Sequence, residues 1–274
     1  MGIGSKSAVR CSFFASGSPR RAERPRRAIA ALLAALIILA GCATGQSHDE
    51  TKLPATSIED VVYYPFQVKG YQNTYPERRV SVIPVVDARD AKSLEGEAAP
   101  PPGHSLIGVT LDQQGRVVER LYGPPLDALT QDAIVRSASE AGMKAATSPL
   151  ALKAALAAPT ADYVVAARIT HFWVTRDHLA DTRFGPGAWR TQARVNLDVA
   201  IYKPPFDVAF WQGQSEGSFV DPPSLIGAGA LDDAVTLYDH PGEDLSVAFT
   251  RAVAGIFKRD DLRTLISEDT LPGR

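Results

Sequence analysis

The sequence predicts an α+β domain, with an antiparallel or mixed sheet of about four to five strands and two main helices packed on one face. Long β-rich segments at residues 162–175 and 190–203 predict the centre of the sheet. A stripe of apolar residues at helical spacing runs through residues 244–266. The predicted order is strand, hairpin, helix, three strands and helix, which is typical of helices covering one face of one sheet. We expect a single domain over residues 61–274.

The first predicted elements are a strand and a hairpin. Residues 79–86 (RVSVIPVV) are β-branched and apolar, and Pro84 marks an edge or a bulge. Residues 105–111 and 116–121 flank a turn that ends in Gly115, which is typical of a β-hairpin.

Two main helices and one shorter helix are predicted. Pro124 and Pro125 open the first, since proline suits the first helical turn, and Gly142 ends it. An Ala- and Leu-rich stretch around residues 149–157 predicts the shorter helix. The last helix covers residues 244–266 and has one apolar face. That face consists of Leu245, Ala248, Phe249, Ala252, Val253, Ile256 and Phe257.

Three strands are predicted between the helices. Residues 162–175 are largely apolar on both faces, as expected for a central strand. Residues 190–203 alternate between two faces, and residues 207–220 form the third strand. In the alternating strand, one face consists of Thr191, Ala193, Val195, Leu197, Val199 and Ile201, and the other of Arg190, Gln192, Arg194, Asn196 and Asp198.

Residues 1–41 have the layout of an export signal peptide. Arginines crowd residues 20–27, an unbroken apolar run covers residues 28–40, and small residues end it. As a helix this run would be about 20 Å long, whereas a hydrocarbon core is about 30 Å thick. We therefore expect a cleaved signal peptide; a core helix or a short anchor is the alternative.

The apolar run ends in Leu39-Ala40-Gly41-Cys42, which resembles the lipobox of bacterial lipoproteins. The resemblance implies that the Cys42 thiol receives a diacylglycerol, that the chain is cut before Cys42, and that the new amino terminus is acylated. Two or three acyl chains, at about 0.8 kcal/mol per buried methylene, anchor a protein stably. We expect Cys42 to be the lipid attachment site and residues 42–60 to hold the lipidated cysteine and a flexible tether.

Composition narrows the partners and the compartment. After the signal peptide, the chain carries 22 basic and 30 acidic side chains, so we expect no nucleic-acid partner. The only cysteines are Cys11 and Cys42, too few for a disulfide framework. Ala43 follows Cys42, whereas Asp at this position commonly retains Gram-negative lipoproteins in the inner membrane. Ala43 therefore favours the outer membrane, with the domain facing the periplasm.

Short patches along the mature chain also carry a resemblance. A strand ends in VDARD at residues 86–90, a helix closes on AGM at residues 141–143, and a later strand contains WQGQSEG at residues 211–217. Together with the closing amphipathic helix, they resemble the YajG-type family of uncharacterised bacterial lipoproteins over roughly residues 78–266. The resemblance implies a sheet-and-two-helix domain related to the periplasmic modules of TolB-like and CsgG-like envelope proteins. It implies no catalytic residues.

One stretch matches a catalytic motif. Residues 213–217 fit G-x-S-x-G, with Ser215 as nucleophile, and Asp232 or Asp233 and His240 follow in triad order. That motif requires a sharp turn from a strand directly into a helix. Only 25 residues separate Ser215 from His240, too few for the intervening sheet. We expect a strand with small residues on one face, and no enzyme.

Other polar and aromatic residues are weaker candidates for a site. No two histidines have i,i+4 spacing, so we expect no metal and no cofactor. Asp87, Arg89 and Asp90 at a strand end can bind a cation or a sugar, but a turn with local ion pairing is favoured. Aromatic residues in the strands can line a ligand groove, but such residues favour the core. The histidines are His48, His104, His171, His178 and His240, and the aromatic residues are Phe172, Trp173, Trp189, Phe210 and Trp211.

These features predict a non-enzymatic outer-membrane lipoprotein that is an accessory or binding component of a cell-envelope machine for transport, cell-wall or surface assembly. Its expected partners are the membrane, through the lipid on Cys42, and an envelope protein. The alternative is a periplasmic lipid- or glycan-binding module. A deep apolar pocket would favour this alternative, and a flat apolar patch would favour a protein partner. Residues 221–240 are apolar for a loop, and we expect them to pack over a sheet edge or to contact a partner.

Overall fold

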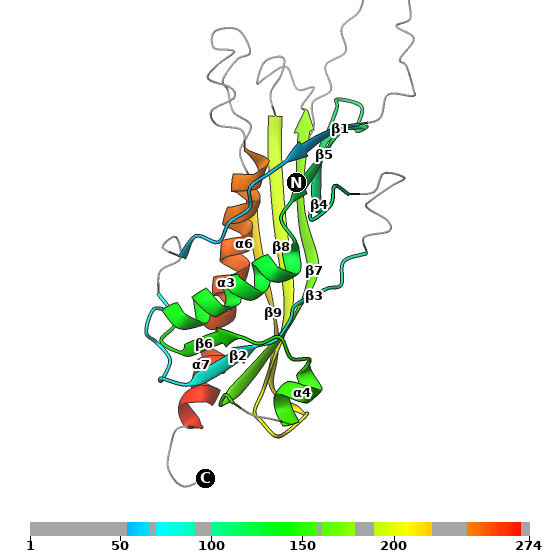
Figure 1. Cartoon of the computed structure of the whole chain (residues 1–274). Helices are drawn as coiled ribbons and strands as arrows, with labels where there is room; N and C mark the ends of the chain where they lie inside the picture. Colours follow the sequence, from blue (N-terminus) through cyan, green and yellow to red (C-terminus); the bar gives the residue numbers. More distant parts are fainter. Residues whose placement is uncertain are drawn as a thin grey trace, which may run out of the picture. The chain divides into compact units, whose positions relative to one another are not determined.

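A nine-stranded mixed sheet with helices packed on it forms the domain (Figure 1). The fold class predicted from the sequence is confirmed, but the sheet has more strands than the four to five expected. The lipobox, Cys42 and residues 221–239 lie outside the described part of the chain. The computed structural model describes residues 54–65, 70–90, 100–157, 160–178, 189–220 and 240–269.

The longest strand, β7 (Tyr163–His178), organises the sheet. One edge of β7 pairs in succession with three parallel strands, β2 (Arg79–Val82), β3 (Val86–Asp87) and β4 (Ser105–Leu111). The other edge pairs with the antiparallel strand β8 (Trp189–Tyr202) along nearly its whole length. A single strand therefore joins two groups of strands into one sheet.

Four more strands complete the sheet. The hairpin partner of β4 is β5 (Val117–Gly123), and β1 (Ala55–Ile58) adds to β5 in parallel. On the other side of β2, the parallel strand β6 (Lys144–Thr147) adds to it. Beyond β8, β9 (Ala209–Val220) is antiparallel. Strand β1 lies within residues 42–60, for which we expected a flexible tether. The folded domain therefore begins before residue 61.

The strand predicted at residues 79–86 is interrupted. It forms two short strands, β2 and β3, which pair with different parts of β7. Pro84 lies between them and has no N–H to donate to the ladder. The predicted hairpin is confirmed, and the backbone of Gly115 has a φ of +76° in its turn.

Two helices cover one face of the sheet, α3 (Leu126–Glu140) and α6 (Pro241–Phe257) (Figure 1). The short helix α4 (Leu152–Ala157) packs against β7 in a separate apolar cluster. Among the described residues, no helix combines the length and the apolar character that crossing a membrane requires.

The stretch predicted as one helix at residues 244–266 is two helices. After α6 ends, Arg259 adopts an extended conformation and α7 (Asp260–Glu268) begins. The Tyr75 hydroxyl donates a hydrogen bond of 3.0 Å to the carbonyl oxygen of Phe257, at the end of α6. Neither glycine nor proline lies at the break, but Asp260 and Asp261 in the first turn of α7 are typical of a helix start.

The main core lies between the sheet and the two large helices. Residues three positions apart in a regular strand point to opposite faces, yet Ile169 and Phe172 of β7 are both buried in the core. A bulge explains this, because it shifts the register with β8 between Ile169 and His171. The alternation predicted for β8 is confirmed: the face from Thr191 to Ile201 is buried. The apolar face predicted for the last helix is buried as well.

The chain between β1 and β2 is fastened to the helices. The backbone N–H groups of Val62 and Tyr64 donate to the hydroxyl oxygens of Ser246 and Thr250, each at 3.0 Å. These two hydroxyl groups are four residues apart on α6, which places them one turn apart on the same face. Residues 62–64 are therefore held against one turn of α6.

Arginine side chains cover part of the outer edge of β9. Arg251 donates to the carbonyl oxygen of Ser218 at 2.6 Å, and Arg259 donates to that of Gln214 at 3.4 Å. The same guanidinium of Arg259 also donates hydrogen bonds to the carboxylate of Asp261, and these bonds are the main cause that lowers the pKa of Asp261 to about 2. Charged groups on a sheet edge oppose pairing with another chain.

Replacing Phe249 with alanine tests whether α6 clamps the sheet. Phe249 is fully buried, and its ring centroid lies 5.4 Å from that of Phe172. The cavity left by Phe249→Ala should cost about 3–5 kcal/mol of roughly 5–15 kcal/mol in total, measured by denaturant unfolding. The matched control is Phe206→Ala, since Phe206 is 63% exposed. Equal unfolding midpoints for the two variants would contradict the clamp.

Candidate ligand-binding site

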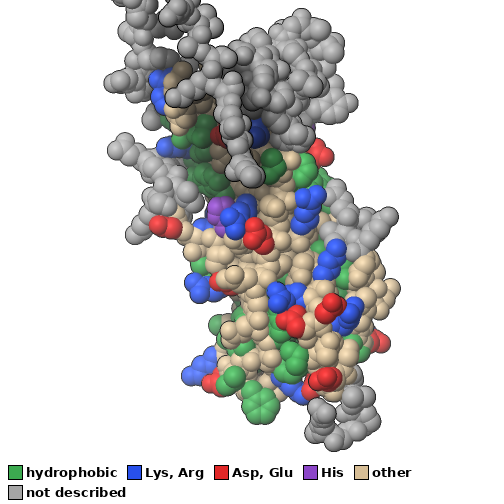
Figure 2. All heavy atoms as spheres, turned by 180° about the vertical axis from the view of Figure 1, so that it is seen from behind, with side chains coloured by type: hydrophobic (Ala, Val, Ile, Leu, Met, Phe, Trp, Pro, Cys, Tyr) green, Lys and Arg blue, Asp and Glu red, His purple; other side chains and the backbone are tan. Residues whose placement is uncertain are grey.

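The face of the sheet opposite α3 and α6 is polar (Figure 2). Side chains in β7, β8 and β9 alternate between the core and this outer face. Charged side chains of both signs are spread over it among uncharged side chains and backbone (Figure 2). The outer positions include Arg168, Thr170, Gln192, Arg194, Asn196, Asp198, Gln212, Gln214, Glu216 and Ser218.

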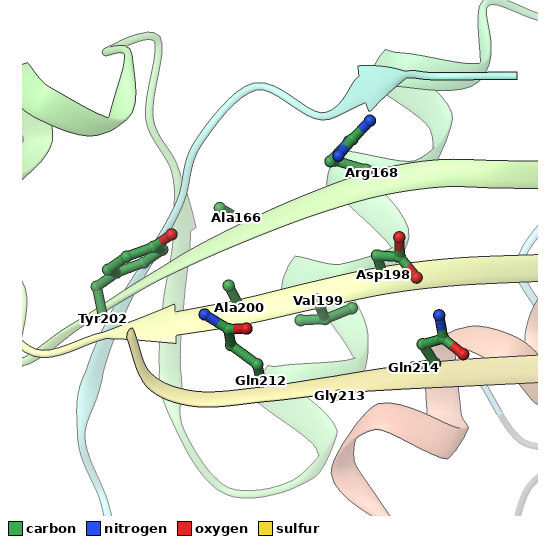
Figure 3. Close-up of a pocket in the computed structure, with 9 residues that line it drawn as sticks. All are labelled: Ala166, Arg168, Asp198, Val199, Ala200, Tyr202, Gln212, Gly213 and Gln214. Carbon is green, nitrogen blue, oxygen red and sulfur yellow. The ribbon is translucent and has the colours of Figure 1, made fainter. Parts of the chain in front are cut away.

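A depression of about 480 Å³ lies in this outer face (Figure 3). It arises from the strand register, which places Ala166 of β7 directly opposite Ala200 of β8. Two methyl groups side by side leave the surface low, while the neighbouring row carries Arg168, Asp198 and Gln214. Ligand sites in proteins commonly have volumes of about 300–1,000 Å³, so the depression has room for a small ligand.

The short helix α4 supports one end of the depression. Its Leu156 belongs to a small apolar cluster with Ile83 and Val164, and Ala166 and Tyr202 pack against that cluster. The Tyr202 ring stands at this end, on the same side of the strands as the polar side chains (Figure 3). The depression is therefore built on strands and a packed helix, which position side chains rigidly.

Among the described residues, the polar side chains around the depression have no protein partner. Arg168 and Asp198 face each other across β7 and β8, yet neither side chain forms an ion pair or a hydrogen bond within the described residues. The side chains of Gln212, Gln214 and Tyr202 likewise form no hydrogen bond in the part of the chain that the structure describes. A cation, an anion, two amides and a phenol are thus available to a ligand.

His171 lies on the outer face beyond the depression and is half-buried. Burial lowers the pKa of its imidazole, and the positive charges of Arg194 and Arg89 lower it further. Arg194 forms an ion pair with Glu216 at 3.0 Å on the same face. The outer face therefore remains polar beyond the depression, and the charges of Arg194 and Glu216 compensate each other there.

The serine of the G-x-S-x-G match packs against a helix. The Ser215 hydroxyl donates a hydrogen bond of 2.5 Å to the carbonyl oxygen of Ala252 in α6. At Gly217, a Cβ atom would lie 1.9 Å from the carbonyl oxygen of Ala248. The small residues of this strand thus allow β9 to approach α6 closely, and the expected strand with small residues on one face is confirmed.

His240, the histidine that follows Ser215 in triad order, lies far from it. His240 directly precedes α6, and Ala252, the partner of Ser215, lies twelve residues further along. At about 1.5 Å per residue, this places them about 18 Å apart along the helix axis. Asp232 and Asp233 lie outside the described residues.

Arg89 has a structural role in the described fold. Its side chain is only 6% exposed and forms an ion pair of 2.8 Å with Asp87. It also donates to the carbonyl oxygens of Leu106 at 2.8 Å and Phe172 at 3.0 Å. The local ion pairing favoured from the sequence is confirmed, and Arg89 in addition joins β3, β4 and β7.

The remaining aromatic residues and histidines are dispersed. Phe172 and Trp211 are buried in the core, as expected for aromatic residues in strands. Trp189 is half-buried, with the His178 ring 4.5 Å away and the Arg176 guanidinium 4.4 Å from its ring centroid. None of these rings lines the depression. Trp173 and Phe210 are also half-buried, His104 bonds to the Pro102 carbonyl, and His48 lies outside the described residues.

Most residues of the depression come together only in the folded chain. The alternation of residues 190–203 does place Asp198 on the polar face. Arg168, Tyr202, Gln212 and Gln214 become neighbours only through the pairing of three strands. The depression is marked by Ala166 and Ala200, which lie opposite each other in β7 and β8. Their pairing can be recognised only when the register of these two strands is known.

Two substitutions in β9 test the packing role of the G-x-S-x-G stretch. Gly217→Ala forces α6 away from the sheet and should cost about 1–3 kcal/mol of stability. Ser215→Ala removes one buried hydrogen bond and should cost about 0.5–1.5 kcal/mol. Ser218→Ala, on the exposed outer side of the same strand, is the matched control. A Gly217→Ala variant as stable as this control in thermal unfolding would contradict close packing.

The sequence matches no protein-family model and no curated protein. The fold is similar to that of a Xanthomonas campestris protein of family DUF330, with 15% identity, a TM-score of 0.42 and coverage of 78% of this chain and 99% of that one. It is also similar to a putative neuraminyllactose-binding hemagglutinin homolog from Helicobacter pylori, with 9% identity, a TM-score of 0.39 and coverage of 75% of this chain and 98% of that one. A third similar structure is lipoprotein GNA1162 from Neisseria meningitidis, with 13% identity, a TM-score of 0.24 and coverage of 59% of this chain and 94% of that one. Likenesses of this degree concern the course of the chain and support no argument about function.

Proposed function

We propose that this chain is a non-enzymatic, lipid-anchored binding module of the bacterial cell envelope, and an accessory component of a transport, cell-wall or surface-assembly machine. The observation that carries the proposal is the outer face of β7, β8 and β9. There the charged groups of Arg168 and Asp198 have no partner among the described residues. Charged groups that are not used to stabilise the fold are available for recognition.

The anchor in this proposal is the lipid on Cys42. The domain begins with β1 at Ala55, which leaves residues 43–54 as the tether. Twelve extended residues span at most about 40 Å. This length permits the outer sheet face to meet a partner in the periplasm while the acyl chains stay in the outer membrane, the location that Ala43 favours.

The second candidate function is a lipid- or glycan-binding module. Of these two ligands, the polar lining of the depression favours the glycan. An apolar gap in the core, near Met143, Phe257 and Ile266, has no room even for a water molecule, so it does not suit an acyl chain.

Replacing Cys42 tests the anchor. Cys42→Ala removes the thiol that accepts the lipid, so palmitate labelling and recovery in the membrane fraction should both be lost. Cys11→Ala, within the signal peptide, is the matched control and should retain both. A Cys42→Ala protein that remains labelled and membrane-bound would show that the anchor lies elsewhere.

Site-specific crosslinking in intact cells tests the binding face. A photoreactive benzoylphenylalanine in place of Gln214 should give discrete crosslinked species, because this position lies at the depression. The same residue in place of Arg136, exposed on α3, is the control and should give none. Equal crosslinking at both positions, or at neither, would contradict a binding role for the outer face.

A further inference from the structure

We propose that the depression in the outer sheet face binds an uncharged saccharide chain; this inference rests on the proposed function and specifies its ligand. The polar groups around the depression offer one positive and one negative charge. They also include both hydrogen-bond donors and acceptors. A ligand that satisfies all of them has no net charge and carries many groups that both donate and accept, as the hydroxyl groups of a saccharide do.

The shape of the depression fits the same chemistry. Its floor is formed by the methyl groups of Ala166 and Ala200, and the Tyr202 ring stands at one end (Figure 3). A sugar ring has apolar C–H faces and a polar rim of hydroxyl groups. The methyl groups and the aromatic ring can pack against a C–H face of a sugar ring. At the sides, the carboxylate of Asp198 can accept hydrogen bonds from the sugar hydroxyl groups, and the amide of Gln212 can both donate to them and accept from them.

Other ligand chemistries fit less well. An anion such as a phosphate meets the carboxylate of Asp198, and a basic peptide meets the guanidinium of Arg168. An acyl chain finds too little apolar surface on two alanines. A free amino acid would depend on solvent-exposed ion pairs, each worth only about 0–1 kcal/mol.

The polar surface is long enough for a chain rather than a single sugar. Outward-facing polar residues continue along β8 from Asp198 through Asn196 and Arg194 to Gln192. From Ala200 to Gln192 the strand extends about 26 Å, at about 3.3 Å per residue. Each exposed contact is weak, so a ligand that spans several rows gains affinity by summing them.

Saturation-transfer NMR with the full chain, purified from membranes in detergent, tests this inference. The probes are the tetrasaccharide of N-acetylglucosamine and maltotetraose, and at least one should receive saturation from the protein. Ala200→Phe fills the floor of the depression and should weaken binding at least tenfold. Asp198→Asn keeps the shape but removes the charge, and should also weaken binding. Arg136→Ala on α3 should leave it unchanged, and melting temperatures confirm that all variants fold.

Each outcome decides the inference. Absence of saturation transfer to both tetrasaccharides overturns it, as does binding that Ala200→Phe leaves unchanged. Crosslinks at Gln214 that persist without saccharide binding mean that a protein occupies the face, so the proposed function stands and the saccharide does not. If transfer and crosslinks are both absent, both proposals fail. Binding to saccharide-free phospholipid vesicles that Ala200→Phe abolishes identifies a lipid ligand instead and overturns the inference.

Discussion

The backbone of β7 must be hydrogen-bonded along both edges, and the rest of the fold depends on how this is achieved. On one edge, β3 pairs up to Ile169 and β4 begins to pair at Val174, so a gap separates the two partners. Arg89 fills this gap by donating to the carbonyl oxygen of Phe172, and Asp87 balances its buried charge. The guanidinium of Arg89 thereby supplies the hydrogen bonds that the backbone of the two strands lacks at this junction.

The opposite edge of β7 leads to the surface that we propose for binding. Because Ser215 and Gly217 of β9 face α6, the helix lies close to the middle of this strand. Ser215 is buried here by packing, and its hydroxyl donates to the carbonyl oxygen of Ala252. Larger polar residues such as Gln214 then occupy the opposite face, where the strands hold them in fixed rows.

The elements with strong periodicity were predictable, and the short ones were not. The alternation of residues 190–203 and the turn at Gly115 identify their strands, because each depends on nearby residues. The four-residue strands β1 and β6 have no periodic signal and exist through pairing with distant partners. At the break before α7, the hydroxyl of Tyr75 from a distant part of the chain donates to the last carbonyl of α6.

The sequence by itself determined the α+β class, the helices and the central strands, because hydrophobic periodicity is a local property. It also predicts the lipid attachment at Cys42, since a signal peptide is read as a linear motif. Only the tertiary structure decided that β7 joins two groups of strands. It likewise decided that Ala166 faces Ala200, so that Arg168 lies beside a hollow. The reason is physical: strand register depends on pairing between residues far apart in the chain, and a shift of one residue would turn each of these side chains to the other face.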